Sequence, residues 1–264
     1  MNRREKEIDN SNSAKPCLSV AIITLNEEDI IELTLKSIKF ADEIVVVDSG
    51  STDGTVELCK KYTDSVTFQK WSGYAAQKNI AIDKCSGDWI LTLDADEPLE
   101  PALADEIKEI IESDAGKDGY YIPRKTFFLG KHIKHGGWSP DYTLRLFKRG
   151  KGRYEERKVH ESLNVEGKKG RTKNSILHYT VRDLAAYAET LDKYSTLAVE
   201  EMARSGKLNG AVLDVVIRPL WAFLHKYFFR LGFLDGIHGL IINGYHAFYV
   251  FSKYSKAWEK KRRS

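Results

Sequence analysis

Three short apolar runs in the first hundred residues constrain the fold of this chain more than any other feature. They read LSVAIIT at 18–24, EIVVVD at 43–48 and DWILTLD at 88–94. The second run has no alternation of apolar and polar residues, which is typical of a parallel strand buried on both faces. Because helix-spaced apolar residues separate the runs, we predict an α/β fold with a doubly wound, mostly parallel sheet and helices on both faces.

The connecting segments predict where the helices lie. In chain order, helices are expected over about 27–39, 55–62, 74–85, 102–113 and 182–204. Thr52 or Asp53 is available as the N-cap of the second helix. Between the last two helices, segments rich in β formers, glycine and aromatic residues predict mixed strands and loops that complete the site.

Composition excludes several classes of protein. The 264 residues, of which 42% are hydrophobic, suffice for one large domain with appendages. With 41 Lys and Arg against 38 Asp and Glu, the net charge of +3 does not favour a nucleic-acid partner. Cys17, Cys59 and Cys85 form no CxxC pair and are interpreted as buried or incidental thiols in a reducing compartment. The polar N-terminus has no apolar run of a signal peptide, so a cytosolic location is expected.

We divide the chain into a polar leader at 1–16, an α/β domain at 17–204 and a helical C-terminal region with a basic tail at 205–264. In the last region Pro219 is expected to open a helix at its first position. That helix would carry basic residues on one half and a wide aromatic and aliphatic face on the other, a pattern typical of helices at a membrane surface. The alternative is a helix packed on protein. A membrane span is not expected, because 236–252 contains three Gly, two His and an Asn.

Polar residues follow each of the three strands, where open parallel sheets bind their ligands. They are Thr24, Asn26 and Glu27 after the first strand, Asp48 with the turn SGSTDGT after the second, and Asp94 and Asp96 after the third. Neither a Gly-x-Gly-x-x-Gly fingerprint nor a Walker loop is present, so a nucleotide would be held differently.

Asp94 and Asp96 form an Asp-x-Asp pair that could converge on one hard cation. Mg²⁺ or Mn²⁺ suits such oxygen ligands, and a diphosphate would supply others. The alternative is a solvated turn that caps the next helix. Asp48 has the same alternative, because Ser-Thr-Asp-Gly is also an ordinary turn and capping signal.

Taken in order, these motifs resemble those of family 2 glycosyltransferases of the GT-A fold. The resemblance over about 18–100 is carried by Asn-Glu after the first strand, VVVDSGSTDGT, Lys78-Asn79 and GDWILTLDAD. A looser likeness continues over 120–255 through GGWSPDYTLRLFKR, VHE, LHYT and GFLDGIHG, toward the branch that contains the lipopolysaccharide-core β-glucosyltransferases. The resemblance implies a GT-A fold and an inverting, metal-dependent transfer from a nucleotide sugar, usually a uridine diphosphate sugar.

The resemblance also implies roles for individual residues. Thr24, Glu27 and Asp48 would line the nucleoside pocket, with Asn26 beside them. Many members have a second Asp where this chain has Ser49, which weakens the base contact.

Asp94 would lie near the ribose and the metal, and Asp96 would bind the metal. His178 resembles the late histidine that completes the metal shell, with a hydrogen-bonded core histidine as the alternative. Lys78 could neutralise phosphate charge, or it could be solvated on its helix.

An inverting transfer requires a base that takes the proton of the acceptor hydroxyl. The candidates are Glu161 in Val-His-Glu, which by position resembles the base of the family and is favoured, and Asp141 in Trp-Ser-Pro-Asp. Trp138, Tyr142 and Arg145 are candidate acceptor or diphosphate contacts, with burial in a core as the alternative.

The leading hypothesis is therefore a metal-dependent transferase that moves a hexose such as glucose from a uridine diphosphate sugar to a glycan or glycolipid acceptor. The acceptor would belong to lipopolysaccharide core or related envelope synthesis, and the enzyme would lie peripherally at the inner face of a bacterial cytoplasmic membrane through 211–264. Two alternatives are a phosphohydrolase with Asp94 as nucleophile and a non-catalytic nucleotide-sugar-binding membrane adaptor.

Overall fold

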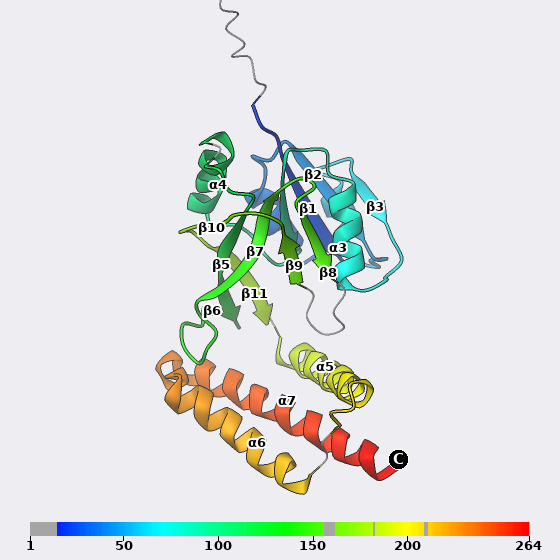
Figure 1. The fold of residues 1–264 in the computed structure, drawn as a ribbon, viewed down its shortest axis with the longest axis vertical. Coiled ribbons are helices and arrows are strands. Elements are labelled where there is room, and N and C mark those ends of the chain that lie inside the picture. Colours follow the sequence, from blue (N-terminus) through cyan, green and yellow to red (C-terminus); the bar gives the residue numbers. More distant parts are fainter. Residues whose placement is uncertain (1–14, 114, 156–161, 182, 209–210, 264) are drawn as a thin grey trace, which may run out of the picture.

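The computed structural model describes residues 15–113, 115–155, 162–181, 183–208 and 211–263. Figure 1 shows a sheet with flanking helices, joined to a separate layer of helices from the end of the chain. The first half contains β1 (Leu18–Thr24), α1 (Ile31–Ser37), β2 (Glu43–Asp48), α2 (Thr55–Cys59), β3 (Val66–Phe68), α3 (Tyr74–Asp83), β4 (Trp89–Asp94) and α4 (Pro101–Ser113). The strands that follow are β5 (Gly119–Phe128), β6 (Lys131–His132), β7 (Asp141–Lys148), β8 (Gly152–Glu155), β9 (Ser162–Val165), β10 (Lys169–Arg171) and β11 (Ile176–Val181). The chain continues through α5 (Leu184–Arg204), α6 (Val212–Leu224), the π-helix η1 (His225–Phe229), the 3₁₀ helix η2 (Gly232–Asp235) and α7 (Gly236–Arg263).

The sheet has the predicted mostly parallel arrangement. Within the described residues its strand order is β10-β5-β7-β4-β1-β2-β3, with β6 and β11 also paired to β5. β4, β1, β2 and β3 are parallel to one another, and β7 runs antiparallel between β4 and β5. The strand order reverses at β1, because β2 and β3 lie on one side of it and β4 on the other. Ligands of open α/β sheets bind at the carboxyl ends of the strands at such a point.

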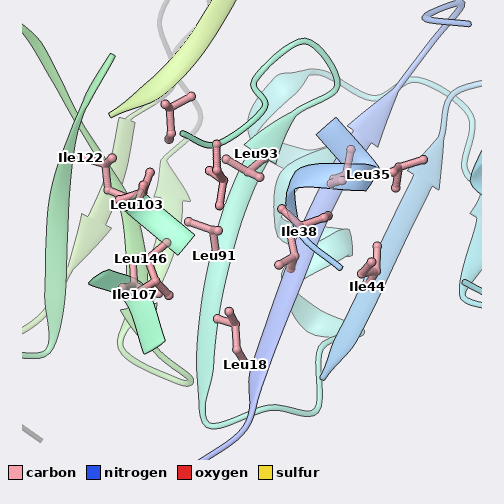
Figure 2. Close-up of a cluster of buried hydrophobic side chains, with 14 of the residues drawn as sticks. Leu18, Leu35, Ile38, Ile44, Leu91, Leu93, Leu103, Ile107, Ile122 and Leu146 are labelled. Atoms are coloured by element: carbon pink, nitrogen blue, oxygen red, sulfur yellow. The ribbon is translucent and has the colours of Figure 1, made fainter. Parts of the chain in front are cut away.

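Burial on both faces explains the apolar runs. In β1, Val20 and Ile22 belong to one hydrophobic cluster, whereas Ala21 and Ile23 belong to another on the opposite face. Successive side chains of a strand point to opposite faces, so a strand covered on both faces needs apolar residues throughout. Figure 2 shows the first cluster, in which Leu103 and Ile107 of α4 lie close to side chains of the sheet.

Two local predictions were wrong. α2 begins at Thr55 with Gly54, rather than Thr52 or Asp53, at the N-cap position, although the Asp53 carboxylate still accepts a hydrogen bond from the nitrogen of Thr55, the first residue of the helix. Pro219 does not open a helix, because α6 begins seven residues earlier and contains Pro219 in its interior. α6 packs on α7, and packing of this kind, which supplies most of the stability of a helix in a protein, outweighs the one backbone donor that Pro219 lacks.

The helices after residue 183 form a layer of their own. α7 lies between α5 and α6 (Figure 1). Lys256 of α7 fixes α5, because its ammonium lies within hydrogen-bond distance of four acceptors on that helix: the carbonyl oxygen and Oδ1 of Asp192 and the hydroxyls of Ser195 and Thr196. α5, which we assigned to the α/β domain, therefore packs on the C-terminal region, and the boundary at 204 stays a prediction. Among the described helices, none is long and apolar enough to cross a membrane.

A polar joint connects this layer to the sheet. The buried carboxylate of Asp235 accepts hydrogen bonds from the backbone nitrogens of Lys134 and His135, at 3.2 and 2.8 Å, in the segment after β6. Lys131 donates to the carbonyl oxygen of Asp235 at 2.8 Å, and Gly136 donates to that of Arg230. These bonds hold the helical layer close to the segment that precedes β7.

Thiol chemistry tests the burial of the core. Cys59 and Cys85 are buried, and burial raises the pKa of each thiol to about 12, whereas Cys17 is exposed. Because the thiolate is the reactive species, we expect one fast-reacting thiol in the native protein and three after denaturation, measured by titration with a chromogenic disulfide reagent. Cys17→Ser should leave none in the native state and two after denaturation. More than one fast native thiol in the wild type would contradict the placement of these residues.

Candidate active site

The polar residues predicted at the strand ends lie on one edge of the sheet. In the register of the strands, Thr24 pairs with Asp48, and Ile23 pairs with Asp94. The carboxyl ends of β1, β2 and β4 therefore adjoin at the reversal of strand order, where a ligand site is expected.

The loop after β1 and the turn after β2 are bonded to each other. Asn26 has a left-handed backbone with φ of 54°, and its side-chain oxygen accepts from the nitrogen of Thr52 at 2.8 Å. Asp48 is buried, and its Oδ2 accepts from the nitrogens of Gly50 and Ser51 at 2.8 and 2.9 Å. Asn26 and Asp48 thus shape the two loops at the edge, and a direct contact with the donor stays a prediction for both.

Two buried polar atoms at this edge have no hydrogen-bond partner among the described residues. They are Oγ1 of Thr24 and Oε1 of Gln77. Gln77 lies in α3, and its side-chain nitrogen donates to Oγ of Ser49 at 2.8 Å. Because buried polar atoms are normally paired, both atoms are candidates for ligand contacts. Gln77 was missed in the sequence, where it only precedes the Lys-Asn pair.

Six charged side chains form an ion-pair chain next to this edge, with positive and negative charges in alternation. In order, the ion-pair chain consists of Lys78, Asp94, Arg145, Glu97, Arg124 and Asp141. Lys78 Nζ lies 2.8 Å from Asp94 Oδ1, and Arg145 Nη2 lies 2.8 Å from Asp94 Oδ2. Lys78 is buried and paired, so the alternative of a solvated lysine does not hold.

Arg145 and Glu97 are the buried centre of the ion-pair chain. Arg145 Nη2 lies 2.6 Å from Glu97 Oε1, and the side chain of Glu97 is completely buried. Arg124 Nη1 approaches the same oxygen at 3.2 Å. The nitrogen of Asp94 donates to Glu97 Oε2 at 3.0 Å, so both carboxylate oxygens are satisfied. Burying charges this deeply is tolerated only when opposite charges and hydrogen bonds compensate them.

The ion-pair chain sets the protonation of its members. Burial alone would raise the pKa of Asp94, but the charges of Lys78 and Arg145 outweigh it and hold that pKa far below its usual range. Burial would likewise raise the pKa of Glu97, and chiefly Arg145 reverses the effect and lowers it. Asp94 therefore stays ionised, with both oxygens already accepting from cations.

Asp96 is the carboxylate that the ion-pair chain leaves out. Its nearest described cation-forming neighbour is His178, whose Nε2 lies 3.5 Å from Asp96 Oδ2. Burial, and then the negative charges of Glu97, Asp94 and Glu27, raise the pKa of Asp96 to about 7 against the opposing effect of His178. Asp96 thus lies in a field of excess negative charge, which a bound cation would relieve.

Backbone pairing brings His178 to Asp96 from a distant part of the chain. The nitrogen of Leu177 donates to the carbonyl oxygen of Pro98 at 2.8 Å, and that of Tyr179 donates to the carbonyl oxygen of Asp96 at 3.2 Å. These bonds flank His178 and fix β11 against the segment after β4. The ring nitrogen Nδ1 of His178 is buried without a partner among the described residues.

The donor set at Asp96 and His178 fits a divalent cation in part. A carboxylate oxygen and an imidazole nitrogen suit Mn²⁺, and the carboxylate also suits Mg²⁺. No group of three carboxylate, imidazole or thiol side chains that could hold a metal occurs within the described ranges. A cation here would need further ligands from water or from a substrate.

The other predicted residues are distributed along β7 and the segment before it. Oδ2 of Asp141 accepts from Nε of Arg124 at 2.9 Å, at the surface end of the ion-pair chain. Tyr142 is exposed, and the guanidinium of Arg171 lies over its ring. Trp138 packs against the cluster formed by β5, β11 and α7, which favours a packing role over an acceptor contact.

Glu161 lies outside the described residues, and so does His160. The role of Glu161 as the base stays a prediction.

Comparison with known proteins identifies the family. The model of glycosyl transferase family 2 matches residues 19–177. A lipopolysaccharide core biosynthesis glycosyltransferase, LpsC of Rhizobium meliloti (strain 1021), is 35% identical over 92% of this chain and 92% of its own. The chain belongs to glycosyl transferase family 2. The expected family, the GT-A fold and the likeness to a lipopolysaccharide-core enzyme are confirmed.

Solved structures show a more distant likeness to this glycosyltransferase. S. aureus TarS 1-349, solved with UDP-GlcNAc, has 14% identity and a TM-score of 0.49, with 93% of this chain and 92% of that chain covered. The mannosyltransferase PcManGT from Pyrobaculum calidifontis, solved with GDP-Man and Mn²⁺, has 16% identity and a TM-score of 0.49, with 94% and 87% covered.

Removing the charge of Glu97 tests the ion-pair chain. Glu97→Gln keeps the shape of the side chain but leaves Arg145 short of one buried counter-charge. We expect the free energy of unfolding to fall by about 3–5 kcal/mol, measured by urea denaturation. The matched control is Asp105→Asn, which breaks the exposed pair with Lys108 and should cost under about 1 kcal/mol. Equal effects of the two substitutions would contradict the central place of Glu97.

Proposed function

We propose that this glycosyltransferase moves a hexose such as glucose, with inversion, from a uridine diphosphate sugar to a membrane-associated glycan acceptor. The acceptor belongs to lipopolysaccharide core or a related cell-envelope glycan, and the enzyme works at the inner face of the cytoplasmic membrane. The observation that carries the proposal is the Asp96–His178 pair at the reversal of strand order, in a chain 35% identical to LpsC. Both carboxylate oxygens of Asp94 already pair with the side chains of Lys78 and Arg145. This arrangement does not favour Asp94 as the nucleophile of a phosphohydrolase.

In this proposal Asp96 and His178 would hold Mg²⁺ or Mn²⁺. A cation held there would supply positive charge to balance the leaving diphosphate. Asp94 lies between this position and the ribose.

The remaining donor contacts come from the edge of the sheet. Thr24, Glu27, Asn26 and Asp48 line the nucleoside side. The free Oγ1 of Thr24 supports a contact there.

Lys78 and Arg145 act chiefly by fixing Asp94, because each already donates to its carboxylate. Their positive charges also favour a diphosphate in the vicinity, since they raise the local potential.

Glu161 is the base that takes the proton of the acceptor hydroxyl as that oxygen attacks the anomeric carbon from the side opposite the diphosphate. Asp141 is the second candidate, and its bond to Arg124 fixes it at the surface end of the ion-pair chain. Tyr142 presents an exposed ring, and the face opposite the Arg171 guanidinium can stack on a sugar, whereas Trp138 keeps a packing role in its hydrophobic cluster.

Donor binding gives the first test. We expect uridine diphosphate glucose with Mn²⁺ to raise the melting temperature by several degrees, since a ligand at about 100 times its Kd stabilises by about 2.7 kcal/mol. Asp96→Ala should abolish both the shift and turnover, whereas the surface control Asp105→Asn should retain both. Full activity of Asp96→Ala, or of the wild type in excess chelator, would contradict metal-dependent transfer.

Glu161→Gln tests the base. We expect kcat to fall by about 10²–10⁴-fold with little change in the KM for the donor, because the substitution removes proton abstraction and leaves the donor site intact. Asp141→Asn should lower kcat less and raise the KM for the acceptor. Steady-state assays of nucleotide release measure kcat and KM for both variants. A larger loss of kcat in Asp141→Asn than in Glu161→Gln would assign the base to Asp141.

A further inference from the structure

Exposed apolar side chains are concentrated in one part of the molecule. Of the 21 large hydrophobic side chains that are exposed among the described residues, 15 lie between Val212 and Phe251. This segment comprises α6, η1, η2 and most of α7. Large exposed apolar areas on a folded protein usually mark an interaction surface.

The outer face of α6 is the most regular part of this area. It is formed by Val212, Leu213, Val216, Ile217, Leu220 and Trp221, each more than half exposed. At 3.6 residues per turn these positions cover about one half of the helix surface. On the other half, the guanidinium of Arg218 lies 4.8 Å from the ring centre of Tyr254 in α7. α6 therefore packs on α7 with one half and presents the other to the surroundings.

The outer face of α6 has a fixed position in the molecule. α7 lies between α5 and α6, so α6 is on the side of the helical layer away from the sheet (Figure 1). The turn between α6 and α7 is tightly packed, since a side chain on Gly239 would collide with the carbonyl oxygen of Gly232, and one on Gly232 with the amide of Asn243. The joint at Asp235 ties this turn to the segment before β7. These contacts tie the face, through the turn, to the segment that precedes β7.

The charge of the same region favours an anionic partner. The segment 211–264 contains nine Lys and Arg against three Asp and Glu, although the whole chain has a net charge of only +3. Four consecutive cations, Lys260 to Arg263, are exposed at the end of α7. Two copies of the segment would bring like charges together, whereas a bilayer with anionic headgroups supplies opposite ones.

We propose that the outer face of α6 docks into the headgroup region of an anionic lipid bilayer, with the basic end of α7 contacting the lipid phosphates. Interfacial helices bind membranes by placing apolar side chains in the headgroup region and cationic side chains beside the lipid phosphates. The inference rests on the proposed function in one respect, because a membrane-bound acceptor makes the placement useful. The sequence prediction assigned membrane contact to 211–264 with a helix that opens at Pro219; the structure begins that helix at Val212 and thereby adds Val212 to Ile217 to its apolar face.

Vesicle binding by the full-length protein tests the docking surface. Co-sedimentation is measured with phosphatidylcholine vesicles and with vesicles that also contain phosphatidylglycerol, without donor or acceptor. We expect binding chiefly to the anionic vesicles and a loss of roughly tenfold or more in Ile217→Ser/Trp221→Ser, since each substitution removes apolar area that the lipid would cover. The matched control is Leu33→Ser/Phe68→Ser, at two exposed apolar positions of the sheet domain, which should bind as the wild type does.

A second variant tests the electrostatic contribution to vesicle binding. Lys261→Glu/Arg262→Glu should weaken binding to the anionic vesicles, and added salt should weaken the binding of the wild type, because both reduce attraction to the lipid phosphates. Circular dichroism and melting temperatures confirm that each variant is folded.

Three results would overturn the docking proposal. One is a wild type that does not bind anionic vesicles, and another is an equal loss in the Leu33→Ser/Phe68→Ser control. The third is a stable wild-type dimer that Ile217→Ser/Trp221→Ser converts to a monomer without any change in vesicle binding, which would assign the face to a second copy. Hydrolysis or transfer of the donor sugar with a detergent-solubilised acceptor is assayed separately, so failure of docking and failure of the proposed function are distinguishable.

Discussion

The buried pairing of Arg145 with Glu97 is the interaction on which the candidate active site depends. Arg145 comes from the antiparallel strand β7, and Glu97 follows the end of β4, so the pair fastens the two halves of the sheet to each other. A buried guanidinium needs compensating anions, and Glu97 and Asp94 supply them within 2.8 Å. The loop that carries Asp94 and Asp96 therefore has one preferred position, because any other would leave these charges unpaired.

The same pairing gives the two aspartates of the Asp-x-Asp motif different electrostatic surroundings. Asp94 is neutralised on both oxygens by Lys78 and Arg145, whereas Asp96 pairs with His178 alone among the described residues and has several negative charges around it. Two carboxylates separated by one residue thus have opposite electrostatic surroundings. This difference supports the proposal that Asp96 binds the cation and that Asp94 positions the loop and the ribose.

Much of the fold was predictable, because burial on both faces of a parallel strand requires uninterrupted apolar sequence. The strands at 18–24, 43–48 and 88–94 lie within a residue of their predicted limits, and the edge that gathers Thr24, Asp48 and Asp94 follows from their parallel order. Gln77, Glu97 and Arg124 were not predicted as site residues. No sequence pattern marks a glutamate that follows Asp-x-Asp as a site residue. Its ion pairs with Arg124 on β5 and Arg145 on β7 show its role. The start of α6 was misplaced because Pro219 was treated as the first position of a helix, although the helix begins at Val212 and continues through the proline.

The sequence by itself determined the α/β class, the family and the set of acidic residues at the ends of the strands, since these depend on local patterns that a short segment carries. Tertiary structure decided which charges are paired, which carboxylate lies outside the ion-pair chain and which half of α6 is exposed. Those properties depend on residues far apart in the chain, such as Asp96 and His178 or Arg145 and Glu97, whose interaction energies exist only once packing has excluded water and brought them within a few ångströms.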